Sequence, residues 1–285
     1  MYELCWTTWT AWTENCHHRS GTPRYNIDIA ALQDTRLAGE CQLEELGAGY
    51  KFFCIGHPEG QPRQAVVGFA IRMTLPSHMV SQPHCISPHI ITMHLQFEHG
   101  RIMVLISAYA PTLLAADDDK EAFYDCLNST ICSVAFRHRL LLIGDFNARI
   151  GRDIVAWPKV TQLAVKNSNG TLLLEMCTKH ELVITNTLFQ MPNKYKTTWK
   201  HPRLKHWHVL DYIITRQRDI SEVHVTQAMR GTGCWSDHRL LWTVLTAKRT
   251  GLQDHARPCP RLLLKQSKVK LGEGCSLYDH QIFKQ

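Results

Sequence analysis

Polar side chains that could act on a phosphodiester stand at the ends of several apolar runs in this sequence. Four of five clusters contain a carboxylate, and among the five there are also an amide, a phenol and an imidazole. The clusters are Gln33-Asp34-Thr35-Arg36, Ser107-Ala108-Tyr109-Ala110-Pro111-Thr112, Gly144-Asp145-Phe146-Asn147-Ala148, Leu210-Asp211-Tyr212 and Ser236-Asp237-His238. Because each follows or interrupts an apolar strand, we expect these side chains to converge on one rim of a sheet.

This set of groups suits phosphodiester hydrolysis. Carboxylates can hold a hard divalent cation that offsets the charge of the phosphate. A base must reach a water molecule, and donors such as imidazole and phenol must reach the phosphoryl oxygens. Asp211 interrupts an apolar strand, and an unpaired buried carboxylate is costly. We therefore expect Asp211 to pair with His238, to hold its tautomer and to favour its charged form.

Each cluster taken alone has a plainer interpretation. An Asp after a strand is more often a turn residue than a ligand. The Tyr-Ala-Pro-Thr segment alone predicts a strand exit, and Asp237-His238 alone predicts a surface turn. The functional interpretation therefore depends on all five clusters occurring together.

The apolar patterns around these clusters predict a layered α/β fold. Apolar runs and period-two alternation predict strands, and a stripe of apolar residues behind an acidic first turn predicts a helix over 117–134. A second helix is expected over 170–180. The expected strands cover 27–32, 66–73, 92–97, 102–109, 140–143, 182–185, 209–215, 222–226 and 240–245. Residues 1–24 show no clear period, and no regular element is expected there.

Composition and charge limit the classes of protein to which this chain can belong. The chain has 285 residues, of which 44% are hydrophobic, and this suffices for one large core. The net charge is +7, and residues 247–285 hold eight basic and three acidic residues. A basic tail can attract phosphates, although a solvated terminus is the plainer interpretation. We expect a divergent segment at 1–24, one domain at 25–246 and a basic, partly disordered tail at 247–285.

Cysteine usage and hydropathy point to an intracellular protein. Eleven cysteines without a CxxC pair argue against a zinc ribbon, and free thiols in a reducing compartment are expected. The first residues lack the basic start of a signal peptide, and no apolar run reaches the roughly 20 residues that span a bilayer. A nuclear location stays open, because Lys265, Lys268 and Lys270 are too dispersed to form a nuclear signal.

The ordered series Leu-Gln-Asp-Thr-Arg, Ser-Ala-Tyr-Ala-Pro-Thr, Gly-Asp-Phe-Asn-Ala, Leu-Asp-Tyr-Ile-Ile and Ser-Asp-His-Arg-Leu resembles the endonuclease/exonuclease/phosphatase superfamily. Over residues 24–246 the chain looks most like endonuclease domains of RTE-type retrotransposons and of the craniofacial development protein 2 type. The segments starting at Arg24, Thr35, Ile184 and Thr198 carry that closer similarity. The resemblance implies a four-layer α/β sandwich of two packed mixed sheets with outer helices.

The resemblance also implies catalytic roles, position by position. Asp145 matches the residue thought to activate the attacking water, which Asn147 orients. Tyr109 matches the tyrosine that contacts the scissile phosphate. His238 matches the catalytic histidine, and Asp211 matches the carboxylate that orients it.

Metal binding is implied at two further positions. Asp34 matches the metal-binding Glu and Asp237 a residue beside the metal and water, and such families use Mg²⁺ or Mn²⁺. Asp is one methylene shorter than Glu, so the Asp34 carboxylate retreats by roughly 1.5 Å. The family also begins with a strand carrying a Trp-Asn pair, whose Asn helps build the metal site, and no such strand is expected here.

Substrate contacts are implied at Asn169 and Trp199. Asn169 lies in an Asn-Ser-Asn-Gly segment that resembles the family's step before a helix, although a helix N-cap is an equal alternative. Trp199 begins a basic and aromatic run to Trp207 that suits stacking on a base and gripping the DNA backbone. Ordinary strand packing is the competing interpretation for Trp199.

The leading hypothesis is a Mg²⁺-dependent DNA endonuclease domain of retrotransposon-derived type that nicks one strand. DNA is the expected partner, a membrane is not expected, and no protein partner can be inferred. A weak or inactive remnant that binds nucleic acid or protein is the first alternative, motivated by Asp34 and the missing Asn. A phosphoinositide or sphingolipid phosphodiesterase on the same fold is the second alternative.

Overall fold

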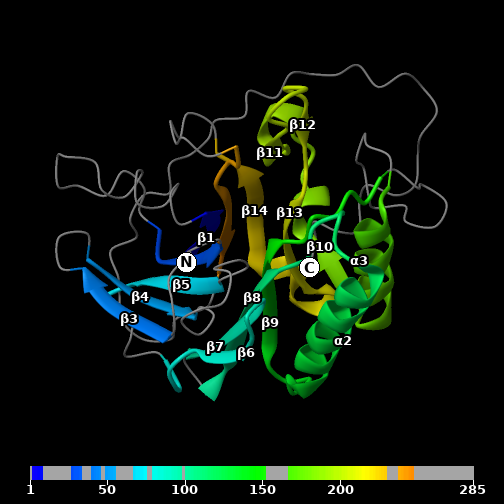
Figure 1. Ribbon diagram of the computed structural model, residues 1–285. Helices are drawn as coiled ribbons and strands as arrows, with labels where there is room; N and C mark the ends of the chain where they lie inside the picture. Colours follow the sequence, from blue (N-terminus) through cyan, green and yellow to red (C-terminus); the bar gives the residue numbers. More distant parts are fainter. Residues whose placement is uncertain are drawn as a thin grey trace, which may run out of the picture. The chain divides into compact units, whose positions relative to one another are not determined.

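Two mixed β-sheets form the body of the protein in a computed structural model. The structure describes residues 2–8, 27–33, 40–45, 49–55, 67–75, 79–97, 100–151, 166–229 and 237–246, all within one compact unit that ends at Thr250. Figure 1 shows these elements and their order along the chain.

The larger sheet has seven strands. Their order is β14 (Val223–Ala228), β15 (Leu241–Leu245), β1 (Tyr2–Thr8), β2 (Ile29–Gln33), β5 (Val67–Arg72), β4 (Tyr50–Ile55) and β3 (Glu40–Glu45). Only β1 and β2 run parallel, and the other neighbours are antiparallel.

The second sheet has six strands, and its centre supplies most of the site described below. Their order is β10 (Leu182–Ile184), β13 (Asp211–Arg216), β9 (Arg139–Asp145), β8 (Ile102–Tyr109), β7 (Ile90–Gln96) and β6 (His84–Ser87). β8 and β9 run parallel, and β13 pairs antiparallel with the other side of β9. The remaining elements are the hairpin β11 (Trp199–Lys200) and β12 (Trp207–His208), the helices α2 (Asp117–Ser133) and α3 (Ser168–Lys179), and the 3-10 turns η3 (Thr185–Thr187), η4 (Asn193–Tyr195) and η5 (Gln217–Glu222).

Alternation along the central strands divides the core into layers. On β9, Leu141 and Ile143 pack between the two sheets, together with Ile29 and Phe69 of the larger sheet. The intervening Leu142 belongs to a separate cluster on the other face. Since successive side chains of a strand point to opposite faces, one apolar strand serves both layers.

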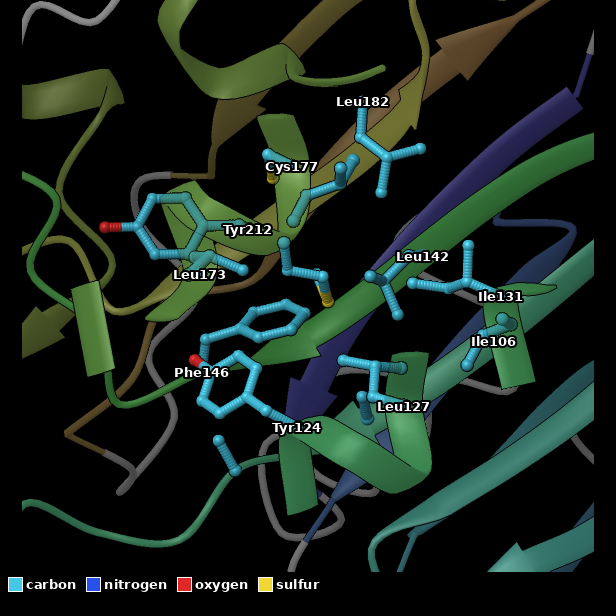
Figure 2. Close-up of a cluster of buried hydrophobic side chains, with 14 of the residues drawn as sticks. Ile106, Tyr124, Leu127, Ile131, Leu142, Phe146, Leu173, Cys177, Leu182 and Tyr212 are labelled. Carbon is cyan, nitrogen blue, oxygen red and sulfur yellow. The ribbon is translucent and has the colours of Figure 1, made fainter. Parts of the chain in front are cut away.

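Helices α2 and α3 cover the outer face of the six-stranded sheet. Figure 2 shows Leu127 of α2 and Leu173 and Cys177 of α3 around Phe146 and Leu142. The predicted α/β sandwich of two packed mixed sheets with helices outside is therefore confirmed on this side. No helix in the described part of the chain is long and apolar enough to cross a membrane.

The expectation that residues 1–24 form no regular element is wrong for residues 2–8. β1 pairs parallel with β2 and antiparallel with β15, so it lies inside the larger sheet. The sequence Tyr-Glu-Leu-Cys-Trp alternates aromatic or apolar residues with others, as half-buried strands do. The widely spaced Trp6, Trp9 and Trp12 obscured that short alternation. The rest of 1–24 lies outside the described residues.

The expectation of free thiols needs one correction. Cys54 is disulfide-bonded, and Cys41 is the residue opposite it in the β3–β4 register. Cys85, Cys126, Cys132 and Cys177 carry free thiols.

Gly144 leaves no room for a side chain between β9 and β8. A Cβ at this position would lie 1.9 Å from the carbonyl oxygen of Ala108, its register partner. Because that neighbour is backbone inside a sheet, Gly144→Ala is expected to lower the free energy of unfolding by about 3 kcal/mol or more. Urea unfolding measures this loss. Gly100→Ala is the control: its Cβ would meet nothing within 4 Å, and its positive φ of 70° should cost about 1–2 kcal/mol.

Candidate active site

Three polar residues lie in one row across the six-stranded sheet. β8 ends at Tyr109, β9 ends at Asp145 and β13 begins at Asp211. In the register of these strands, Tyr109 pairs with Asp145 and Asp145 pairs with Asp211. Three separate sequence motifs are therefore brought to the same edge by strand pairing alone.

His238 completes a compact group with two of these carboxylates. Its Nδ1 lies 3.2 Å from Oδ2 of Asp211, and its Nε2 lies 4.0 Å from Oδ2 of Asp145. Asp211 is fully buried and Asp145 is 4% exposed. One ligand atom from each of the three residues lies within 4.8 Å of the others.

Burial and neighbouring charges shift the pKa values of Asp145 and His238. Burial, and then the neighbouring Asp211, raise the pKa of Asp145 to about 7, although His238 and the backbone N–H of Asn147 oppose the shift. Burial disfavours the charged imidazole of His238, but Asp211, Asp145 and Asp237 outweigh it and raise the pKa of His238 to about 9. The geometry thus combines a carboxyl that titrates near neutrality with an imidazole that stays charged.

Asn147 is held tightly beside Asp145. Its backbone N–H donates to Oδ1 of Asp145 at 2.8 Å, and its Nδ2 donates to the carbonyl of Ala110 at 2.9 Å. Its φ of 46° is in the left-handed region, which Asn tolerates better than most residues. The turn after β9 is therefore fixed to the end of β8.

The Asn-Ser-Asn-Gly segment forms the start of α3. Asn167 is the N-cap, and its Oδ1 accepts from Gly170 N and Arg149 N, both at 2.8 Å. Asn169, the residue predicted to contact substrate, is 0% exposed. Its Nδ2 donates to the carbonyl of Pro111, and its Oδ1 has no partner among the described residues. In this conformation Asn169 braces the exits of β8 and β9 and presents no surface to a substrate.

Trp199 and Asp237 are bonded to each other. Trp199 Nε1 donates to Oδ2 of Asp237 at 2.6 Å, and the Trp199 ring lies 6.4 Å from that of His238. Trp199 also forms a backbone bridge with His238. Asp237 is exposed and stands apart from the group formed by Asp145, Asp211 and His238.

Asp34, predicted as a metal ligand, lies outside the described residues. Ser236, the first residue of the predicted Ser236-Asp237-His238 cluster, also lies outside them. β2 ends at Gln33, directly before Asp34.

Several residues around the site were not assigned a role from the sequence. Gln33 bonds to both central strands, and Thr198 Oγ1 accepts from the backbone N–H groups of Leu210 and Asp211. The guanidinium of Arg239 lies 3.4 Å from the ring centre of Trp207 and donates to Thr197. The sequence signal that could have found two of them is that Gln33 directly precedes Asp34 and Arg239 directly follows His238.

The donor set fits a hard divalent cation. Two buried carboxylates repel each other, and this repulsion contributes to the raised pKa of Asp145. Oδ1 of Asp211 is buried and has no hydrogen-bond partner among the described residues. A cation beside these oxygens would offset both costs, and carboxylates are the ligands that Mg²⁺ and Mn²⁺ prefer.

Comparisons with known proteins agree with this geometry. The curated craniofacial development protein 2 of Bos taurus is 29% identical over 265 residues, which cover 90% of this chain. The chain spans only 43% of that relative's length. The AP endonuclease LMAP from Leishmania major has the same fold, with a TM-score of 0.64, 15% identity and coverage of 87% of this chain and 88% of its own.

The endonuclease domain of TRAS1, a telomere-specific non-LTR retrotransposon, also shares the fold. Its TM-score is 0.56 at 12% identity, with coverage of 89% of this chain and all of that domain. The model of the endonuclease/exonuclease/phosphatase family matches residues 17–238. That span includes the whole six-stranded sheet and the row from Tyr109 to Asp211. The chain therefore belongs to the endonuclease/exonuclease/phosphatase family.

Proposed function

We propose that this domain is a metal-dependent DNA endonuclease that hydrolyses one phosphodiester bond by water attack. The observation that carries the proposal is the row of Tyr109, Asp145 and Asp211 closed by His238 at 3.2 Å and 4.0 Å. The resemblance to nuclease domains of AP endonucleases and retrotransposons supports DNA as the substrate class.

In this mechanism each residue has a distinct task. Asp145 takes a proton from the attacking water, and Asn147 orients that water. The charged imidazole of His238 donates to a phosphoryl oxygen, where negative charge grows, and Asp211 keeps the imidazole charged and oriented. Tyr109 donates to the same phosphate.

A divalent cation, when bound, would neutralise phosphate charge. Asp145 and Asp211 would contribute the described ligands, and Asp34 and Asp237 are proposed to complete the site. The hydrogen bond from Trp199 Nε1 keeps the carboxylate of Asp237 in a fixed orientation.

The test is nicking of supercoiled plasmid in Mg²⁺ and separately in Mn²⁺, with Asp145→Ala as the control. Nicking that disappears in the control is expected. A folded protein that leaves the plasmid closed in both metals would contradict the proposal and favour a binding remnant.

The hairpin β11–β12 is proposed to grip DNA beside the site. Its tip at 202–206 is exposed, with Leu204 at 64%, and Trp207 stacks against Arg239 and Lys200. Arg203→Ala with Lys205→Ala is expected to reduce the slope of log K against log salt by about 2, because two phosphate contacts are lost. Fluorescence anisotropy with a labelled duplex measures the slope.

A matched control exists at the opposite end of the sheet. Arg137 and Lys179 are also exposed, and they lie before the start of β9 and at the end of α3. Arg137→Ala with Lys179→Ala removes the same charge and should leave the salt slope unchanged. Equal slopes for both pairs would show that the hairpin does not contact DNA.

The alternative of a weakened remnant follows from two substitutions. β1 is present, so the first strand is not missing. We take its Trp6-Thr7 as the counterpart of the Trp-Asn pair that the resemblance implies. Asp34 replaces the family's Glu. If these two differences weaken metal binding, Thr7→Asn with Asp34→Glu should raise the nicking rate by about tenfold or more, as ligand changes do at metal sites. A rate that does not rise would place any weakness elsewhere.

A further inference from the structure

Gln33 connects the two sheets at the edge where the site lies. It is the last residue of β2 in the seven-stranded sheet, and it is 1% exposed. Its Nε2 donates to the carbonyl of Ala108 on β8 at 2.9 Å. Its Oε1 accepts from the backbone N–H of Asp145 on β9 at 3.2 Å. One carboxamide therefore bonds to both central strands of the opposite sheet.

Gln33 and the two residues whose backbones it contacts are each a proposed site residue or directly next to one. Gln33 directly precedes Asp34, and Ala108 directly precedes Tyr109. The third contact is the backbone of Asp145 itself. The side chain of Gln33 thus joins the end of β2 to the ends of β8 and β9, which carry Tyr109 and Asp145.

A carboxamide of this length is required for the connection. It offers a donor and an acceptor at once, whereas an ionised Glu has no donor and Met has neither. Asn has the same groups but is one methylene shorter. Because the side chain is buried, water cannot replace the lost bonds without a rearrangement.

We propose that Gln33 is a positioning residue that sets the spacing between the carboxylate of Asp145, the end of β8 that carries Tyr109, and the end of β2. The inference rests on the proposed metal-dependent function of the same site. Gln33 touches neither substrate nor metal in this role. It acts through the backbone of the strands to which it bonds.

The experiment compares Gln33→Met and Gln33→Asn with Thr215→Val. Thr215 is also buried, and its Oγ1 donates to the carbonyl of Leu140 at 2.9 Å, at the far end of β9. Each variant removes buried side chain–backbone bonding to β9, but only Gln33 lies at the catalytic edge. Mn²⁺ affinity by electron paramagnetic resonance, kcat and KM for nicking, and the midpoint of thermal unfolding are measured for all.

Both Gln33 variants are expected to weaken Mn²⁺ binding by about 10- to 100-fold, as residues that orient metal ligands do. The loss in nicking should appear in kcat, with KM for DNA little changed. Thr215→Val should unfold at a lower temperature and keep its Mn²⁺ affinity. Should Gln33→Met fail to fold, Gln33→Asn, which keeps a buried amide, gives the same comparison.

Two outcomes would overturn the inference in distinguishable ways. If the unaltered chain binds Mn²⁺ and nicks DNA, but the Gln33 variants only lower thermal stability as Thr215→Val does, then Gln33 is structural and the positioning role is wrong. If the unaltered chain neither binds Mn²⁺ nor nicks, the proposed function itself fails, and the positioning role fails with it.

Discussion

Asp145→Asn is expected to abolish nicking and at the same time to stabilise the metal-free domain. The loss of the proposed base should lower kcat by about 10³-fold. The gain in stability follows from the raised pKa of Asp145: burial and Asp211 disfavour its charged form. An amide has similar volume, keeps an acceptor for Asn147 N–H and carries no charge.

The sign of the pH dependence follows from that shift. The folded-state pKa of about 7 exceeds the ordinary aspartate pKa of 3.8, so the folded state holds the proton more tightly. The stability this contributes is complete below about pH 4 and is lost as the pH rises through about 7. Asp145→Asn should therefore match the unaltered chain near pH 4 and exceed it by up to about 4 kcal/mol at pH 8.

Thermal unfolding in a metal chelator at pH 4 and pH 8 measures this difference, alongside nicking of plasmid. Added Mn²⁺ should reverse the order at pH 8, because the cation binds the ionised carboxylate of the unaltered chain. An Asn variant that is equally stable at every pH, or that nicks normally, would contradict the role assigned to Asp145.

Asp211→Asn is expected to lower kcat by about 10³-fold through His238. After the opposing effect of burial, the carboxylate of Asp211 is the largest cause that raises the pKa of His238 to about 9. Without it, the imidazole loses its proton at a lower pH and can no longer donate to the phosphate. The alkaline limb of the nicking profile should therefore move to lower pH.

The pH dependence of kcat/KM between 6 and 10 and an NMR titration of His238 test this prediction. Asp219→Asn is the control, since Asp219 pairs with Arg218, away from the site. The interpretation fails if Asp211→Asn leaves both the alkaline limb and the His238 titration where they were.

Much of the six-stranded sheet could be predicted because its central strands are long apolar runs ending in polar clusters. The hairpin of β7 and β8 and the helix α2 follow their expected patterns closely. β3, β4 and β6 were not predicted, and the paired segments of β11 and β12 are only two residues long, too short to show a period. β1 owes its structure to its two neighbours in the sheet as much as to its own sequence.

The motifs predicted that Tyr109, Asp145 and Asp211 share one edge because each stands at the end of an apolar strand or interrupts one. His238 was expected beside Asp211 because a buried carboxylate needs a partner. The motifs could not show how side chains bond across different elements. The burial of Asn169 and the Trp199–Asp237 bond depend on loop conformation, which local sequence does not determine. The bridge made by Gln33 depends on how two sheets stack.

The pairing of β1 with β15 constrains the order in which the domain can be built. Tyr2 lies opposite Leu245, so two of the most distant described segments are neighbours in the larger sheet. During synthesis, β1 emerges first and must wait for nearly the whole domain before its antiparallel partner exists. Contacts of such long sequence separation slow folding, and the waiting strand presents an unpaired edge. We therefore expect co-translational folding of the larger sheet to be completed last at the pairing of β1 with β15, where chaperone binding would have the most time to act.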